Sequence, residues 1–259
     1  MSRRSLSLLA LVVTAAAAVA VGSANAADLP VPASGAYYPP SYAPAIYNWT
    51  GLYLGGNVGL SLMDDTDTAT TSNGYQNAGT RTDLRDLGWM GGVQFGVNYE
   101  FTPVVVGVEG TWSPAYMTAS NIIPSLVLAN SQRAYANEPW FATVTGRIGY
   151  AWDDLLFYGR GGVAWMDVNY RQDDLNFAGA VAFSQQINDV RTGFTAGVGL
   201  EYGLTEHWSA RIEYNFFDFG TKTYNFNNLS TTTGPIGPFP ISINSIVNSI
   251  TAGINFRFN

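Results

Sequence analysis

The chain of 259 residues contains no cysteine and one histidine, and charged residues make up only 12% of it. Without cysteine there can be no disulfide framework, no thiolate metal site and no cysteine nucleophile. After residue 26, glycine, asparagine, threonine or a charge interrupts every apolar stretch, so none provides the roughly 20 apolar residues that a membrane-spanning helix needs. Backbone pairing and side-chain packing must therefore hold the fold together.

The first 26 residues have the order of a secretory signal peptide. Arg3 and Arg4 precede an apolar run over 6–21, which ends at the small-x-small site Ala24-Asn-Ala26. A membrane anchor is the alternative, but the apolar run is short for one. Cleavage after Ala26 leaves ten basic against 19 acidic residues, a net charge of −9. An acidic exported protein is a poor candidate for nucleic-acid binding, so we expect no nucleic-acid partner.

Residues 27–48 hold five prolines and no apolar period. This composition is typical of an extended linker, here a periplasmic one that leads into a folded domain over 49–259. A peptide-recognition role for residues 37–40 is the alternative to a plain spacer.

The folded part has a period of two in its apolar residues. In the closing segment, Ile250, Ile254 and Phe258 lie on one face and Asn255 and Arg257 on the other. Aromatic residues make up 14% of the chain and glycine contributes 28 positions, a mixture that suits a membrane β-barrel. The alternation predicts eight spanning strands, near 49–63, 87–101, 104–117, 139–152, 155–169, 190–204, 207–220 and 246–258.

The connections between these segments alternate strictly between short and long. The short ones are at 101–103, 152–155 and 204–207, and the long ones are 64–86, 118–138, 170–189 and 221–245. This order predicts an all-β fold, an eight-stranded antiparallel up-and-down transmembrane β-barrel with tight periplasmic turns and long extracellular loops. A soluble sandwich would also alternate along its strands, but it has no reason to alternate its loop lengths. Eight is even, so both ends of the domain should be periplasmic.

The two faces of the strands predict what lies outside and inside the barrel. Aromatics near the strand ends should form two girdles, with Trp49, Trp152 and Trp208 at the short-turn end and Trp112 and Trp140 nearer the long loops. The inward faces should receive a polar network with both charge signs: Glu109, Arg147, Arg160, Glu201, Arg211, Glu213 and Arg257. Side chains fill the interior of an eight-stranded barrel, which favours a salt-bridged core over an open pore.

No group of residues predicts a catalytic, cofactor or metal site. His207 lies in a short periplasmic turn, away from the loop serines at the other end. The acids at Asp64, Asp65 and Asp67 and at Asp173 and Asp174 do not have the spacing of a calcium loop, so we expect solvated loop acids. Tyr224 and Phe226 are expected on an external loop, with contact to a planar or lipidic ligand as the alternative.

Four motifs carry a resemblance to a known family. They are the start of the first strand, Trp49-Thr-Gly-Leu-Tyr-Leu-Gly-Gly-Asn-Val-Gly59, the mature start Ala26-Ala-Asp-Leu-Pro30, the segment Tyr158-Gly-Arg-Gly-Gly-Val-Ala164 and the ending Gly253-Ile-Asn-Phe-Arg-Phe258. Together they resemble the small outer-membrane β-barrel proteins of alphaproteobacteria, the immunogenic "porin family" with opacity- and OmpA-type barrel architecture.

The resemblance implies a surface protein of the Gram-negative outer membrane with a structural or surface-interaction role and no enzymatic activity. Its implied partners are outer-membrane lipid and lipopolysaccharide, periplasmic chaperones and the barrel-assembly machinery, for which Phe256 and Phe258 would form the signal. An oligomer is left open. The alternatives are a porin-like channel for small solutes and, more distantly, a lipid-modifying enzyme.

Overall fold

The computed structural model describes residues 47–72, 77–124, 131–175, 179–230 and 234–258. The predicted signal peptide and all but the last two residues of the predicted linker lie outside these ranges. The described residues contain no helix that is long and apolar enough to cross a membrane.

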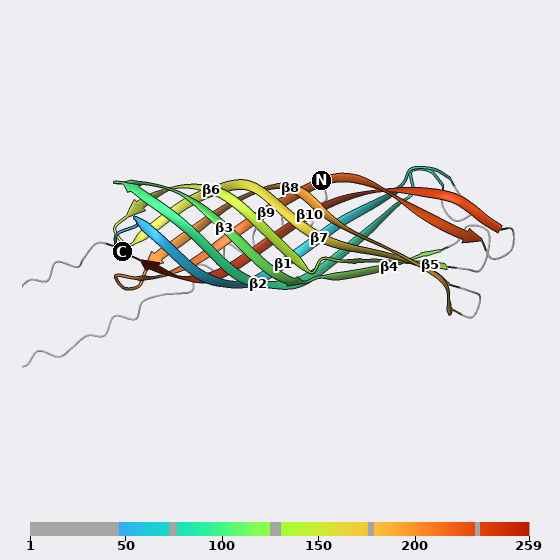
Figure 1. Ribbon diagram of the computed structural model, residues 1–259, viewed down its shortest axis with the longest axis horizontal. Coiled ribbons are helices and arrows are strands. Elements are labelled where there is room, and N and C mark those ends of the chain that lie inside the picture. The colour runs from blue at the N-terminus through green and yellow to red at the C-terminus, as the bar shows by residue number, and fades with distance from the viewer. Residues whose placement is uncertain (1–46, 73–76, 125–130, 176–178, 231–233, 259) are drawn as a thin grey trace, which may run out of the picture. The chain divides into compact units, whose positions relative to one another are not determined.

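The described residues form ten strands (Figure 1). The strands are β1 (Gly51–Ala69), β2 (Arg81–Phe101), β3 (Val104–Tyr116), β4 (Thr118–Pro124), β5 (Ser131–Asn137), β6 (Trp140–Trp152), β7 (Leu155–Leu175), β8 (Val181–Gly203), β9 (Trp208–Ser230) and β10 (Gly234–Phe258). Every pair of neighbouring strands is antiparallel.

Eight of these strands close into a ring. The order β7-β6-β3-β2-β1-β10-β9-β8 returns to β7 through the β7–β8 ladder, so the ring has no free edge. The first and last strands pair along most of their length, from Leu52 opposite Phe258 to Ala69 opposite Ile241. The other two strands continue the ring strands beside them, because β4 follows β3 after Met117 and β5 precedes β6 across Glu138 and Pro139.

Away from the short turns, the ring divides into two four-stranded sheets. The β2–β3 ladder ends at Trp89 opposite Tyr116, and the β8–β9 ladder ends at Phe194 opposite Asp218. Beyond these points β2-β1-β10-β9 form one sheet and β4-β5-β7-β8 form the other. In Figure 1 the blue-green and red strands of the first sheet separate from β4 and β5 toward the right. We call these paired sheets the outer unit: 61–69, 81–86, 118–124, 131–137, 167–175, 181–189, 218–230 and 234–247.

Nearer the short turns, the outward face of the ring is apolar. Leu52, Leu54, Val58 and Leu60 alternate along β1, each about half exposed, and the other ring strands repeat the pattern. Such a surface is much larger than the apolar patches that water-soluble monomers expose. The apolar band therefore marks the part of the ring that lies in lipid.

The sequence located the strand ends at the short turns to within about two residues but misplaced the other ends. The four connections expected as long loops are largely strand, because β1, β2, β7, β8, β9 and β10 run on into the outer unit and β4 and β5 form a hairpin within 118–138. In the outer unit the strands have no lipid-facing apolar side, so the apolar–polar alternation that identified the spanning segments is lost. The count of eight ring strands is correct.

Candidate functional site in the barrel interior

The middle of the barrel interior is filled by one buried ion-pair network. Glu109 on β3 lies at its centre, with its carboxylate 2.5 Å from Arg211 Nη1, 3.0 Å from Arg160 Nη1 and 3.7 Å from Arg147 Nη1. Glu213 joins the same cluster through Arg160 at 3.0 Å. These side chains are at most 5% exposed, so water contributes little to balancing their charges.

The network continues toward the short turns through Glu201 on β8. Its carboxylate lies 2.9 Å from Arg147 Nη2 and 3.9 Å from Arg257 Nη2, and it accepts hydrogen bonds from Ser209 at 2.6 Å and Asn255 at 2.9 Å. The structure thus links all seven residues of the polar network that the sequence proposed, which come from β3, β6, β7, β8, β9 and β10.

Two tyrosines that the sequence did not predict as interior residues complete the network. Tyr53 donates to Glu109 at 2.7 Å and Tyr158 donates to Glu213 at 2.5 Å, while the Arg147 guanidinium lies over both rings. A signal was present, since Tyr53 alternates with the outward residues Leu52 and Leu54. The expectation that aromatic residues lie at the membrane interfaces explains why this inward tyrosine was not predicted.

At the short-turn end, the residues just before β1 close the barrel mouth. Trp49 is fully buried, and Arg257 lies against the rings of Tyr47 and Trp49 at 5.4 and 5.5 Å and donates to the Trp49 carbonyl. Asp154 accepts from the Tyr47 backbone NH at 3.0 Å, which fixes the segment to the β6–β7 turn. The expectation that Trp49 belongs to the lipid-facing aromatic girdle at the short-turn end is therefore wrong. Its ring is buried inside the barrel mouth, where it contacts the Arg257 guanidinium.

Inward glycines provide room for the large interior side chains. A Cβ atom on Gly96 would collide with the ring and hydroxyl of Tyr53, and one on Gly199 would lie 2.5 Å from the Tyr158 ring. These two glycines therefore create no open space in the lumen, because Tyr53 and Tyr158 pack over them.

Replacing Gly96 by alanine is expected to destabilise the barrel by about 1–3 kcal/mol, because the Tyr53 ring has to move away from Glu109. Urea unfolding in lipid vesicles, followed by the gel mobility of unheated samples, measures this loss. Gly146→Ala is the matched control, since nothing lies within 4 Å of its added Cβ. An equal stability for the two variants would show that Tyr53 does not depend on the glycine.

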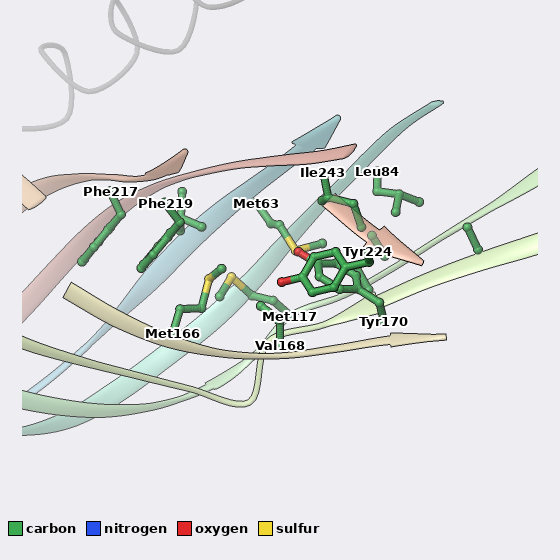
Figure 2. Packing of buried hydrophobic residues seen from close by; sticks show 14 of the residues in the cluster. Met63, Leu84, Met117, Met166, Val168, Tyr170, Phe217, Phe219, Tyr224 and Ile243 are labelled. Carbon is green, nitrogen blue, oxygen red and sulfur yellow. The ribbon is translucent and has the colours of Figure 1, made fainter. Parts of the chain in front are cut away.

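Beyond the ion pairs, an apolar cluster crosses the interior (Figure 2). Met63, Met117 and Met166 are fully buried, and Phe217 and Phe219 stack with ring centroids 6.4 Å apart. Figure 2 shows these side chains directed toward one another from strands on several sides of the ring. The interior is thus polar at the level of the lipid and apolar where the outer unit begins.

Arg191 on β8 joins the two sheets of the outer unit across an unpaired seam. It donates to Ser245 Oγ at 2.7 Å, to Tyr170 Oη at 3.3 Å and to the carbonyls of Phe219, Gly220 and Ile243 at 3.2, 2.6 and 3.2 Å. These acceptors belong to β7, β9 and β10, so one guanidinium replaces the backbone ladder that is missing between β8 and β9.

Three buried carboxyl groups in or directly beside the outer unit, Asp65, Asp67 and Glu138, share Arg191 as their nearby cation. Burial raises the pKa of Asp65 to about 6, and burial together with the charge of Asp65 raises that of Asp67 to about 8. Burial also raises the pKa of Glu138 well above its ordinary value. Neither carboxylate oxygen of Glu138 has a hydrogen-bond partner among the described residues. Near neutral pH the shifts therefore favour the protonated form of Asp67 and Glu138, while Asp65 is mostly ionised.

We expect the outer unit to lose stability as the pH rises from about 4 to about 8. A raised pKa means that the folded state binds more protons than the unfolded state between the two pKa values, so the free energy of opening falls with rising pH. Hydrogen exchange of the outer strands, corrected for intrinsic rates, measures it, and Asp67→Asn should flatten the dependence. Stability that increased with pH would contradict this assignment.

The acids at 64–67 were expected to be solvated, and two of the three are not. Asp64 is partly exposed, whereas Asp65 and Asp67 are 0% and 9% exposed and face the interior. Asp173 is also buried, where it binds Arg171 at 2.8 Å; the side chain of Asp174 lies outside the described residues. The prediction failed because β1 and β7 continue past the lipid band and keep their period of two.

Tyr224 and Phe226 are likewise buried residues of β9 and not side chains of an external loop. They pack in the same apolar cluster as Ile241 and Ile243 of β10, and Tyr224 donates to Asp189 at 2.6 Å.

His207 lies in the turn between β8 and β9, as the sequence predicted. Its ring stacks on Phe256 at 5.7 Å, and its carbonyl accepts from the backbone NH of Arg257 at 2.8 Å. Phe256 and Phe258 form an edge-on pair at 5.1 Å on the outward face of β10, beside Trp208. Among the described residues, no group of three His, Cys, Asp or Glu side chains is arranged to hold a metal ion.

A closed ring of eight antiparallel strands with an apolar exterior and a charged interior defines an integral β-barrel protein of the outer membrane. The profile described as outer membrane protein beta-barrel domain matches residues 7–234. The chain belongs to this family, as the resemblance of its motifs predicted.

Relatives and solved structures agree with this assignment. The chain is 31% identical to the 31 kDa outer-membrane immunogenic protein of Brucella melitensis over 221 residues, 80% of this chain and 85% of that one. It is 25% identical to a 22 kDa outer membrane protein of Rhizobium leguminosarum over 187 residues, 72% of each chain.

Among solved structures, OprG of Pseudomonas aeruginosa aligns with a TM-score of 0.53 and 16% identity, over 82% of this chain and 99% of that one. The protease OmpT of Escherichia coli aligns with a TM-score of 0.50 and 10% identity, over 82% and 98%. At these identities the likeness shows the fold alone. The predicted fold class and location in the outer membrane of a Gram-negative bacterium are confirmed.

Proposed function

We propose that this protein is a closed outer-membrane barrel that carries the outer unit at the cell surface, with a structural and surface-interaction role and no enzymatic activity. The observation that supports it is the filling of the interior by three successive layers. These are the Arg257 group at the periplasmic mouth, the ion pairs around Glu109, and the apolar cluster that includes Met117 and Phe217. Each layer draws side chains from strands on several sides of the ring.

The seven charged residues of the polar network are proposed to seal the lumen. In an open pore these guanidinium and carboxylate groups would face water. Here they bind one another instead, at distances down to 2.5 Å. Four arginines against three glutamates leave no excess of negative charge to attract cations into the barrel. A pore would have to break these pairs in the low-dielectric interior, which is costly.

The partners are proposed from the surfaces. Outer-membrane lipid covers the apolar band, lipopolysaccharide surrounds its outer rim, and periplasmic chaperones hold the chain before insertion. The barrel-assembly machinery would read Phe256 and Phe258, which project outward from the last strand beside Trp208.

Planar-bilayer recording of the refolded protein tests the closed lumen. We expect no reproducible single-channel steps from protein whose folding is verified by a shift in gel mobility on heating. Reproducible steps of uniform size would favour a porin-like channel and overturn the proposal.

A further inference from the structure

The outward face of the sheet β4-β5-β7-β8 carries two arginines around one tyrosine. Tyr135 on β5 lies opposite Arg171 on β7, and the guanidinium carbons of Arg171 and Arg133 lie 5.6 and 6.0 Å from its ring centre. Ala134 and Ala136 are buried, so Tyr135 between them points out of the paired sheets. We call this surface the arginine face: Arg133, Tyr135, Asn169, Arg171, Gln186 and Asn188.

The arginine face carries a net positive charge, although the chain as a whole has a net charge of −7. Arg171 is balanced by the buried Asp173, with two bonds of 2.8 and 2.9 Å. Arg133 donates to the Tyr135 hydroxyl at 3.1 Å, and it forms no ion pair with a carboxylate among the described residues. The next outward acid on β7, Asp167, lies four residues before Arg171, about 13 Å along the strand.

Arg133 is prepared to bind an anionic group. A guanidinium has five N–H donors in a planar fork that matches a phosphate or a carboxylate. Arg133 uses one of these donors on Tyr135, and the attraction between its charge and the Tyr135 ring holds the side chain at the surface. Less side-chain freedom is therefore lost when an anion binds.

Side-chain amides lie beside the two arginines. Gln186 on β8 lies opposite Arg171, and Asn188 lies opposite Asn169. Gln186 Nε2 donates to Asn188 Oδ1 at 2.8 Å, so the two amides form one row on this face. An amide offers both donors and acceptors, as do the hydroxyl groups of a sugar. The arginine face therefore suits an acidic saccharide better than an apolar anion.

The arginine face lies above the level of phospholipid headgroups. Along β7 the outward residues change from Val163 and Trp165 to Asn169 and Arg171. Six residues separate Trp165 from Arg171, which is about 20 Å along the strand and roughly 15 Å along the membrane normal at a tilt of about 40°. Ordinary headgroups add only about 5–8 Å to each leaflet. The saccharide part of lipopolysaccharide extends further from the hydrocarbon than these headgroups do.

The direction of the arginine face also favours a neighbour within the membrane. In Figure 1, β4 and β5 run on from the ring along the long axis of the molecule. The outward face of their sheet is therefore turned sideways, toward the molecules that surround the barrel, and not toward the external medium above it.

We infer that the arginine face binds the acidic oligosaccharide of a neighbouring lipopolysaccharide molecule. An anionic group lies at Arg133 and Arg171, and sugar hydroxyl groups lie against the amides beside them. The inference rests on lipopolysaccharide as a proposed partner and gives that partner a site. It does not depend on the closed lumen, which bilayer recording tests separately.

The first test measures binding of a soluble probe to the refolded protein in phospholipid nanodiscs by titration calorimetry. The probe is the acidic core oligosaccharide released from lipopolysaccharide by mild acid, which has no acyl chains and so cannot partition into lipid. A maltooligosaccharide of similar length is the uncharged comparison. We expect saturable binding of the acidic probe, at least about tenfold tighter than that of the neutral one. Equal binding of the two, or no saturable binding, would overturn the inference.

A variant of Arg133 assigns the binding to the arginine face. Arg133→Gln breaks no ion pair among the described residues and should fold normally, and it should weaken binding of the acidic probe at least about tenfold. Arg85→Gln is the matched control, because it removes an exposed arginine from the outward face of the other sheet. Equal affinities of Arg133→Gln and the unchanged protein would overturn the site while leaving lipopolysaccharide as a proposed partner.

Photocrosslinking in intact outer membranes identifies the occupant. Gln186→Cys introduces a single cysteine on the arginine face, to which a photoreactive maleimide is attached. We expect an adduct with lipopolysaccharide, and a lower yield when Arg133→Gln is added. Adducts with a secreted polysaccharide or a protein in place of lipopolysaccharide would overturn the choice of partner.

Discussion

Replacing Glu109 by alanine is expected to lower the free energy of unfolding of the barrel by about 3–5 kcal/mol. Glu109 lies within 4 Å of Arg147, Arg160 and Arg211 and also accepts a hydrogen bond from Tyr53. Its loss leaves three buried guanidinium groups with two carboxylates, Glu201 and Glu213, to balance them. Urea unfolding in vesicles, read by tryptophan fluorescence, measures the change.

Asp64→Ala is the control for this prediction. It also removes a carboxylate from an arginine, with 3.0 Å between Arg85 Nε and Asp64 Oδ1, but both side chains are more than a third exposed. Exposed pairs contribute less than about 1 kcal/mol. A loss below about 1 kcal/mol for Glu109→Ala as well would mean that the central network does not stabilise the barrel.

Replacing Arg191 by methionine is expected to separate the two sheets of the outer unit while the barrel remains folded. The variant loses five hydrogen bonds, three of them to backbone carbonyls. Those of Phe219 and Gly220 lie on β9 where it has no ladder partner on β8, and that of Ile243 lies on β10. The substitution also removes the nearby cation from Asp65, Asp67 and Glu138. We expect the free energy of opening of the outer strands to fall by at least about 3 kcal/mol.

Hydrogen exchange resolved by segment distinguishes the two parts of the molecule. Protection should be lost over 181–189 and 218–226 and kept over 194–203 and 208–217, where the β8–β9 ladder is intact. Lys222→Met is the control, because its pair with Asp189, although 2.6 Å long, is half exposed. Uniform loss of protection over both regions would mean that Arg191 supports the whole barrel.

The sequence predicted the part of the fold that lies in lipid because lipid imposes a sharp contrast on each strand. Outward Ile212 and inward Arg211 and Glu213 differ so strongly that alternation identifies the faces, and the short turns fix the strand ends. The same contrast selected Glu109, Arg147 and Arg257 as interior residues. Pairing between strands distant in the sequence, such as Arg211 with Glu109, requires the ring order and cannot be read from the alternation alone.

The outer unit could not be predicted in the same way because water lies outside its sheets. Along β1 the inward residues Met63, Asp65 and Asp67 mix apolar and acidic types, while Asp64 and Thr66 face outward, so the two faces look alike in the sequence. The burial of Tyr47 and Trp49 was also inaccessible, since it depends on Arg257 at the other end of the chain. The sequence predicted Tyr47 in the linker and Trp49 in the aromatic girdle.

The closed lumen is tested most directly by the accessibility of one interior thiol. The chain has no cysteine, so Ser249→Cys introduces a single one. Ser249 is 2% exposed and lines a space between the ion pairs and the apolar cluster, together with Arg160 and Phe217, and its hydroxyl has no partner among the described residues. The substitution should therefore leave the barrel folded.

A charged thiol reagent is applied to proteoliposomes from either side, with Thr221→Cys as the exposed control in the outer unit. A sealed lumen predicts rapid labelling of Thr221→Cys and no labelling of Ser249→Cys until the protein is unfolded. Labelling of Ser249→Cys at a rate similar to the control, in protein that is still folded, would contradict the closed barrel.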